Sequence, residues 1–213
     1  MSAAEAMLAR LIGRYPVLGS CRREIEAARE ALETSFEAGG KLLLCGNGGS
    51  AADCEHIAGE LLKGFERKRP LPEDVRGALA QQGDDGAELG AKLQQGLPAI
   101  SLAGHPSLAS AFANDVDASL IFAQLVNALG SPGDVLLAIS TTGRARSVVM
   151  AARTARAVGM VTIALTGQGG GRLAKLCDIC IDAPGETTPD VQELHVPIYH
   201  YLCRALEARF FPE

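Results

Sequence analysis

The sequence predicts a doubly wound α/β fold, in which helices flank a five-stranded, mainly parallel sheet. Short apolar runs alternate with helical segments along the chain, as βαβ units require. Aromatic residues make up only 4% of the chain and Trp is absent. Abundant Ala, Leu and Gly favour helices packed on a sheet over a sandwich or barrel. The length of 213 residues suits a single domain over residues 1–213.

Five apolar runs bounded by turn residues are typical of buried parallel strands. They cover residues 41–45, 99–103, 134–140, 160–166 and 179–183. Helical periodicity fills the intervals and predicts helices over residues 50–67, 107–129 with a break near Asp115, 145–158 and 190–211.

Two amphipathic segments, residues 3–14 and 21–38, form an N-terminal helical segment over residues 1–40. The polar, Gly-rich stretch 70–98 is interpreted as an insertion or lid-like segment with a short helix over residues 87–95. The basic run Lys63, Arg67, Lys68 and Arg69, which is interrupted by an acidic residue, is interpreted as a solvated helix end.

The charge balance excludes several classes of partner. A formal net charge of -5 and a pI near 5.4 argue against binding to nucleic acid or an anionic membrane, which needs a basic face. Any phosphate site must therefore be local. No apolar run is long enough for a membrane span and residues 1–15 lack the zones of a signal peptide, so we expect a cytoplasmic protein. The six cysteines, including the Cys177-x-x-Cys180 pair, are expected to be reduced.

A glycine-rich turn, Gly46-Asn47-Gly48-Gly49-Ser50, follows the first apolar run. Glycines let the backbone approach a ligand, Ser50 can cap the next helix, and a helix N-terminus attracts anions. The turn matches neither a Walker loop nor a dinucleotide fingerprint, so it does not indicate a nucleoside triphosphate or a dinucleotide.

A hydroxyl-rich turn, Ser140-Thr141-Thr142-Gly143, follows the third run. Its hydroxyl groups suit phosphate oxygens at the carboxyl edge of a parallel sheet, although many such turns only cap helices. Two ligand-type turns in one sheet favour a phosphorylated small molecule.

Histidine and carboxylate side chains mark two of the predicted helices. His56 and Glu60 lie four residues apart on one helix face and can bind a metal or supply an acid and a base; a solvated pair is the alternative. On the last helix, Gln192 and His200 lie within about 80° of each other, whereas His195 falls about 140° from His200 and is expected to face elsewhere.

Together these motifs resemble the phosphoheptose isomerases of the SIS (sugar isomerase) superfamily. The resemblance runs in order through residues 41–200. Its motifs are the glycine turn with His56 and Glu60, Asn114-Asp115, the hydroxyl turn, Leu165-Thr166-Gly167, and Gln192-Glu193-Leu194-His195 with His200. It implies the SIS fold, a phosphorylated sugar as ligand, and a homotetramer or homodimer built through the N-terminal helices.

The resemblance also implies a role for each matching residue. Glu60 would be the catalytic base and His200 the acid that convert sedoheptulose 7-phosphate to D-glycero-D-manno-heptose 7-phosphate. Zinc would be held by His56, Glu60, Gln192 and His200, a donor set that suits this metal. The sugar would contact Asn47, Gly48, Gly49, Asn114 and Asp115, with Glu60 and Gln192 at its reacting end, and the phosphate would contact Ser50, Ser140, Thr141 and Thr142.

Three departures from the family pattern keep a second hypothesis open. Ala145 replaces a phosphate-binding serine and is flanked by Arg144 and Arg146, either of which is a candidate phosphate ligand. Gly64-Phe65 stands where an arginine often follows a glycine, and Pro189-Asp190 replaces Asp-Arg. The alternative is a non-catalytic phosphosugar-binding sensor or adaptor, of the kind associated with replication initiators. Retention of all four implied zinc ligands counts against it.

Overall fold

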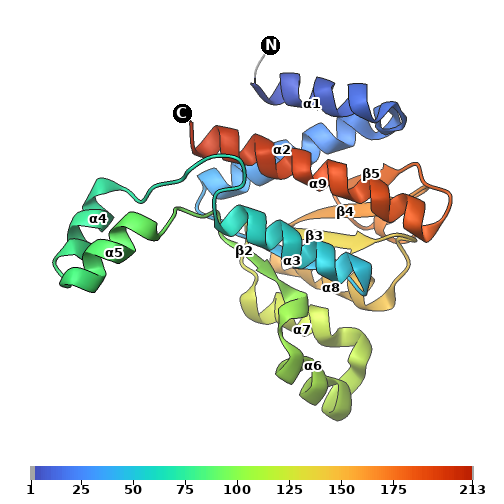
Figure 1. Cartoon of the computed structure of the whole chain (residues 1–213). Helices are drawn as coiled ribbons and strands as arrows, with labels where there is room; N and C mark the ends of the chain where they lie inside the picture. Colours follow the sequence, from blue (N-terminus) through green and yellow to red (C-terminus); the bar gives the residue numbers. More distant parts are fainter. Residues whose placement is uncertain (1–2, 213) are drawn as a thin grey trace.

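A five-stranded sheet forms the centre of the computed structural model, which describes residues 3–212 apart from the side chain of Asp84 (Figure 1). All strand pairings are parallel, in the order β2-β1-β3-β4-β5. The strands are β1 (Leu42–Cys45), β2 (Ala99–Ser101), β3 (Val135–Ser140), β4 (Val161–Gly167) and β5 (Ile179–Ala183). The predicted α/β class is confirmed, and each strand end lies within two residues of its expected position.

Helices cover both faces of the sheet. On one face lie α1 (Ala3–Arg14), α2 (Arg22–Glu37), α3 (Gly49–Leu62) and α9 (Thr188–Phe210), and on the other lie α7 (Ile121–Leu129) and α8 (Arg146–Val158). Leu42 and Leu44 of β1 belong to the first core cluster, whereas Leu43 and Cys45 belong to the second. Successive residues of a strand point to opposite faces, so an apolar run buries both sides of β1.

The direction of winding changes between β1 and β3. These strands are neighbours, but α3 and α8, the helices that follow them, lie on opposite faces. Doubly wound sheets bind ligands in the crevice at the carboxyl ends of such a strand pair. The glycine turn and the hydroxyl turn both leave from these strand ends, so the fold brings the two predicted ligand turns together.

The connection from β2 to β3 is broken as expected near Asp115. After α6 (Pro106–Phe112), the backbone forms a π-helical turn over Ala113–Asp117 and a 3-10 turn over Ala118–Leu120 before α7 begins. None of the helices in the described part of the chain is both long and apolar enough to cross a bilayer.

The helix after the glycine turn ends at Leu62, five residues earlier than expected. Lys63 adopts an extended conformation, and the backbone N–H groups of residues 65–67 bind the carboxylate of Glu207 instead of helix carbonyl groups. The prediction of a solvated helix end for the basic run is wrong, because Arg69 is 0% exposed.

Residues 70–98 contain two helices, α4 (Glu73–Ala80) and α5 (Asp84–Lys92), where a single helix over residues 87–95 was expected. The pair stands away from the sheet at the C-terminal end of α3 (Figure 1). A bridge between Pro70 and Gln94 closes its base. The hairpin therefore lies at the opposite end of α3 from the glycine turn and does not cover that turn in its own chain.

The amino ends of β1 and β3 are joined by Asp134. Its buried carboxylate accepts hydrogen bonds from the backbone N–H groups of Lys41 (2.9 Å) and Ser131 (2.8 Å) and pairs with the Lys41 ammonium group.

We expect Asp134→Asn to lower the free energy of unfolding by about 2 kcal/mol, because the new amide donor faces groups that are themselves donors. Urea unfolding measures this loss. Both ligand turns leave the opposite ends of the strands, so ligand affinity should stay at the wild-type value. Wild-type stability of the variant would show that the contact contributes nothing.

Candidate active site

The candidate catalytic residues lie where α3 and α9 pack side by side and run in the same direction (Figure 1). Gly49, at the start of α3, lies against Gln192 near the start of α9. Further along, the ring of His56 lies 5.5 Å from that of Tyr199 and 5.2 Å from that of His200. The helix pair therefore extends from the carboxyl edge of the sheet to a cluster of rings about two turns along.

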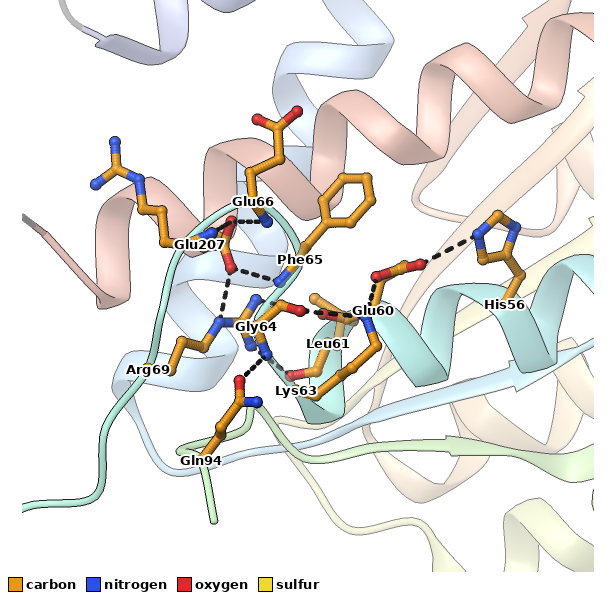
Figure 2. A network of polar contacts seen from close by, with 11 residues as sticks. His56, Glu60, Leu61, Lys63, Gly64, Phe65, Glu66, Arg69, Gln94 and Glu207 are labelled. Carbon is orange, nitrogen blue, oxygen red and sulfur yellow. Dashed lines mark hydrogen bonds and ion pairs between the residues drawn. The ribbon is translucent and has the colours of Figure 1, made fainter. Parts of the chain in front are cut away.

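Glu60 lies at the centre of this cluster. Its carboxylate is 3.3 Å from His56 Nε2 and 2.7 Å from Lys63 Nζ, and its side chain is only 15% exposed (Figure 2). The His56 and Glu60 side chains face each other because they are one turn apart on the same face of α3. The His56 side chain is 44% exposed, so only Glu60 of the pair is largely withdrawn from solvent.

The other side of the His56 ring is held by Tyr199 and Asp53. Tyr199 Oη lies 3.0 Å from His56 Nδ1 and donates a hydrogen bond to Asp53 Oδ1 at 3.3 Å. Burial, then the nearby Asp53 carboxylate, raises the pKa of Tyr199, so the phenol keeps its proton. With that proton directed to Asp53, Tyr199 Oη accepts a hydrogen bond from His56 Nδ1, and His56 Nε2 faces Glu60.

His200 has a free nitrogen in a buried position. Its Nε2 has no hydrogen-bond partner among residues 3–212. Burial lowers the pKa of His200, and positive charge on His56 and Arg204 lowers it further. The imidazole is therefore neutral at pH 7, and it can both accept and donate a proton.

The predicted zinc ligands are only partly assembled in one chain. His56, Glu60 and His200 cluster, whereas the Gln192 amide lies against Gly49, where an added Cβ would come within 2.4 Å of Gln192 Nε2. Eight residues separate Gln192 from His200, about 12 Å along the helix axis. His195 faces elsewhere, as expected: it is buried, and its Nε2 lies 3.1 Å from the Thr166 carbonyl oxygen.

The chemistry of the clustered groups fits zinc. Within residues 3–212 no three His, Cys, Asp or Glu side chains are grouped to hold a metal ion. However, His56 Nε2 and the Glu60 carboxylate lie 3.3 Å apart, and imidazole nitrogen and carboxylate oxygen are both zinc ligands. Tyr199 holds the second nitrogen of His56, as partners behind a ligating histidine commonly do. Zinc stays a prediction.

The glycine turn is shaped by close contacts. Gly48 is the N-cap of α3 with φ of 56°, so Ser50 lies inside the helix and does not cap it, contrary to expectation. A Cβ at Gly46 would come within 2.7 Å of the Ser50 carbonyl oxygen. Asn47 donates from Nδ2 to Ser147 Oγ at 3.1 Å across the crevice. Sequence reasoning missed Ser147, although a serine four residues after the hydroxyl turn was a usable signal.

The two candidate arginines have different neighbours. Arg144 lines a cavity together with Thr141 and Thr142, whereas Arg146 donates from Nε to Ser119 Oγ at 2.9 Å. Of the two, Arg144 is the one that adjoins the predicted phosphate-binding hydroxyl groups.

Two of the predicted phosphate ligands are covered in this structure: Ser50 and Ser140 are 4% and 6% exposed. Asn114 and Asp115 are exposed on the π-helical turn and form a 2.9 Å hydrogen bond with each other. The structure therefore leaves Thr141 and Thr142 as the accessible hydroxyl groups of the turn.

A buried ion pair fixes the segment that follows Glu60 (Figure 2). The Glu207 carboxylate accepts hydrogen bonds from the backbone N–H groups of Phe65 (2.8 Å), Glu66 (2.8 Å) and Arg67 (3.2 Å), and from Arg69 Nε (2.9 Å). Sequence reasoning missed this pair, because its members are 138 residues apart.

Arg69 extends the same network to the end of α3. It donates to the carbonyl oxygens of Leu61 (2.7 Å) and Glu60 (3.3 Å), which have no partner within the helix. The pair thus holds the backbone of Glu60. It also fixes the loop that places the Phe65 ring 5.5 Å from the ring of His200.

The fold and these motifs define the class of protein, and comparison with known families agrees. Two family models described as SIS domain match residues 17–90 and 107–200.

Known relatives identify the family more closely. The phosphoheptose isomerase of Roseiflexus sp. (strain RS-1) is 40% identical, covering 89% of this chain and 83% of the relative. That of Rhodospirillum rubrum is 38% identical, covering 89% and 88%. The solved phosphoheptose isomerase from Francisella tularensis superposes with a TM-score of 0.75 at 29% identity, covering 97% of this chain and 98% of that one. The chain belongs to the phosphoheptose isomerase family of SIS-domain enzymes.

Glu207→Gln should lower the free energy of unfolding by about 3–5 kcal/mol at pH 7, because it leaves the Arg69 guanidinium buried without a counter-charge. Burial alone would raise the pKa of Glu207, but the hydrogen bonds from Phe65, Glu66 and Arg69 lower it below its ordinary value of 4.5. A lowered folded-state pKa stabilises the protein above that ordinary value, and this contribution is lost as the pH falls through the folded-state pKa.

The stability difference between wild type and Glu207→Gln should therefore be full at neutral pH and shrink below about pH 4.5. Urea unfolding across this range measures it. Asp134→Asn is the matched control, because it also replaces an ion-paired, buried carboxylate but makes no contact with the Glu207–Arg69 network. A difference for Glu207→Gln that does not change with pH would contradict this account.

Proposed function

We propose that this chain converts sedoheptulose 7-phosphate to D-glycero-D-manno-heptose 7-phosphate, with Glu60 as the base and His200 as the acid. The observation that carries the proposal is the contact of Glu60, His56 and a neutral His200 in a member of this family. A non-catalytic sensor or adaptor is not favoured, because the relatives at about 40% identity are isomerases by name.

The reaction moves a carbonyl group from C2 to C1 through an enediol. Glu60 takes a proton from C1 of the ketose while His200 donates a proton to the C2 oxygen. His200 then takes the proton from the C1 oxygen, and Glu60 returns its proton to C2, which yields the aldose. A single ring nitrogen of His200 can serve both oxygens in turn, because it gives its proton to the C2 oxygen and then takes one from the C1 oxygen, which leaves the other nitrogen for a metal.

Zinc is part of the proposal, with His56, Glu60 and His200 of one chain as ligands. The predicted fourth ligand, Gln192, would have to come from another chain, because in its own chain it lies about 12 Å from His200 along α9. When bound, zinc would polarise the carbonyl oxygen. The support is the donor chemistry of the cluster and the unpartnered Nε2 of His200.

The phosphate end of the substrate is assigned to the two ligand turns, and this assignment implies a second copy of the chain. Ser50 and Glu60 are ten residues apart on α3, about 15 Å along its axis. A straight seven-carbon chain with its phosphate ester spans only about 12 Å, with bonds of about 1.5 Å. Moreover, His200 lines a cavity of about 270 Å³ beside α1, whereas Thr141 and Thr142 line a different one at the sheet edge.

We therefore propose a homotetramer or homodimer in which the Glu60–His200 cluster of one chain meets the ligand turns of another. The N-terminal helices α1 and α2, which pack against α9, are the proposed contacts between chains. A cytoplasmic location is also proposed, since all six cysteines are free thiols, as a reducing compartment favours.

Purified protein supplied with zinc and incubated with sedoheptulose 7-phosphate should form the aldose, followed by NMR. Glu60→Gln should lower kcat by about 10²- to 10⁴-fold, because the base is lost. Glu55→Gln, which changes an exposed glutamate on the same helix, should keep wild-type activity. Metal content of the same samples tests zinc. Tight binding of the sugar phosphate without turnover would establish the sensor hypothesis instead.

Mixing two inactive variants tests the shared site. Glu60→Gln removes the base, and Thr141→Val with Thr142→Val removes the exposed hydroxyl groups of the phosphate end. If one chain supplies each half, refolding the two variants together should restore part of the turnover, because some mixed sites receive both wild-type halves. No recovery from a mixture that forms hybrid oligomers by native mass spectrometry would place the whole site within one chain.

A further inference from the structure

A cavity of about 690 Å³ opens over the carboxyl ends of β3, β4 and β5. The loops that follow these three strands line it, together with the first residues of α9. Thr141 and Thr142 of the hydroxyl turn form one side, so the cavity adjoins the turn assigned above to the phosphate end of the substrate. The loop after β4 is not among the residues assigned to the site so far.

Three cations line this cavity: Arg144 from the loop after β3, and Arg172 and Lys175 from the loop after β4. Each side chain is exposed, and within the described part of the chain none has an ion-pair partner. Glu186, exposed at the same cavity, is the one carboxylate among its lining residues. A surplus of two positive charges at one hollow of a chain with net charge -5 attracts anions locally.

Backbone contacts between glycines hold the two cationic loops together. Gly143 accepts hydrogen bonds at its carbonyl oxygen from the N–H groups of Arg172 (2.8 Å) and Leu173 (3.1 Å). Gly171 has φ of 55°, and a Cβ there would come within 2.3 Å of the Thr142 carbonyl oxygen. The loops therefore meet at a distance that only glycine permits, and this contact sets Arg172 beside the hydroxyl turn.

We propose that Arg172 and Lys175, from the loop after β4, add two positive charges beside Arg144 and the hydroxyl turn and bind a phosphate group there. Guanidinium groups match the oxygens of phosphate in pairs, and the ammonium group adds a point charge. The phosphate has two chemical sources, the substrate itself or a separate phosphorylated ligand. The first source rests on the proposed function, because it presumes that the sugar phosphate is the substrate. Binding of phosphate itself does not depend on that function and can be measured without turnover.

The test compares the double variant Arg172→Ala/Lys175→Ala with Arg153→Ala, which removes an exposed cation of α8 outside the cavity. The probes are inorganic phosphate and sedoheptulose 7-phosphate, both titrated by calorimetry into the purified protein. We expect the double variant to bind inorganic phosphate at least tenfold more weakly than wild type, and Arg153→Ala to bind it normally. Thermal unfolding verifies that both variants are folded.

Each outcome discriminates. If affinity for the sugar phosphate falls with that for inorganic phosphate, and phosphate competes with the sugar, the substrate supplies the group. If only inorganic phosphate is lost and the sugar binds as before, the site takes a separate phosphorylated ligand. Equal phosphate affinity in the double variant and Arg153→Ala overturns the proposal, and it does so whether or not the protein is an isomerase.

Discussion

The carboxylate of Glu207 is the contact on which the arrangement of α3 and α9 depends. Removing a carboxylate and a guanidinium group from water costs several kcal/mol per ion, and attraction between them repays this only when their remaining polar atoms are also satisfied. Here three backbone N–H groups and two carbonyl oxygens complete the pair. The contacts that satisfy the ion pair also end α3 just beyond Glu60. The same hydrogen bonds therefore stabilise the buried charges and fix the position of the base.

The two halves of the candidate site differ in their electrostatics. Around His200, burial and then positive charge on His56 and Arg204 lower the pKa of the imidazole, which favours the neutral form that suits proton transfer between oxygens. At the carboxyl edge of the sheet, unpaired cations and hydroxyl groups gather around a hollow, which suits a dianionic phosphate. A phosphate group beside His200 would favour the imidazolium form. Separation of the phosphate end of the substrate from its reacting end therefore keeps the His200 imidazole neutral.

The sheet was predictable because its sequence signals are local. The ion pair of Glu207 and Arg69 that holds the backbone of Glu60 was not predictable. Apolar runs and turn glycines lie within a few residues of each other, and they located all five strands and both ligand turns. Helical periodicity continues past Leu62, so it placed the end of α3 too late: the helix ends there because Glu207, far along the chain, takes the N–H groups of the next residues. Likewise, spacing put Gln192 and His200 on one face but did not reveal that they reach different ends of α3.

Two of the three departures from the family pattern have structural roles in this chain. Asp190 forms a capping box with Thr187, which stabilises the N-terminus of α9 next to the ligand turns. Phe65 packs its ring near His200, and Arg204 lies over the Phe65 ring, so an aromatic contact fills the position next to the acid. Ala145 lacks a hydroxyl group, but Arg144 beside it lines the cationic cavity. Asp190 supplies a helix cap and Phe65 a packing contact, whereas nothing in the structure explains Ala145. All three departures leave Glu60 and His200 in contact with the same neighbour, His56.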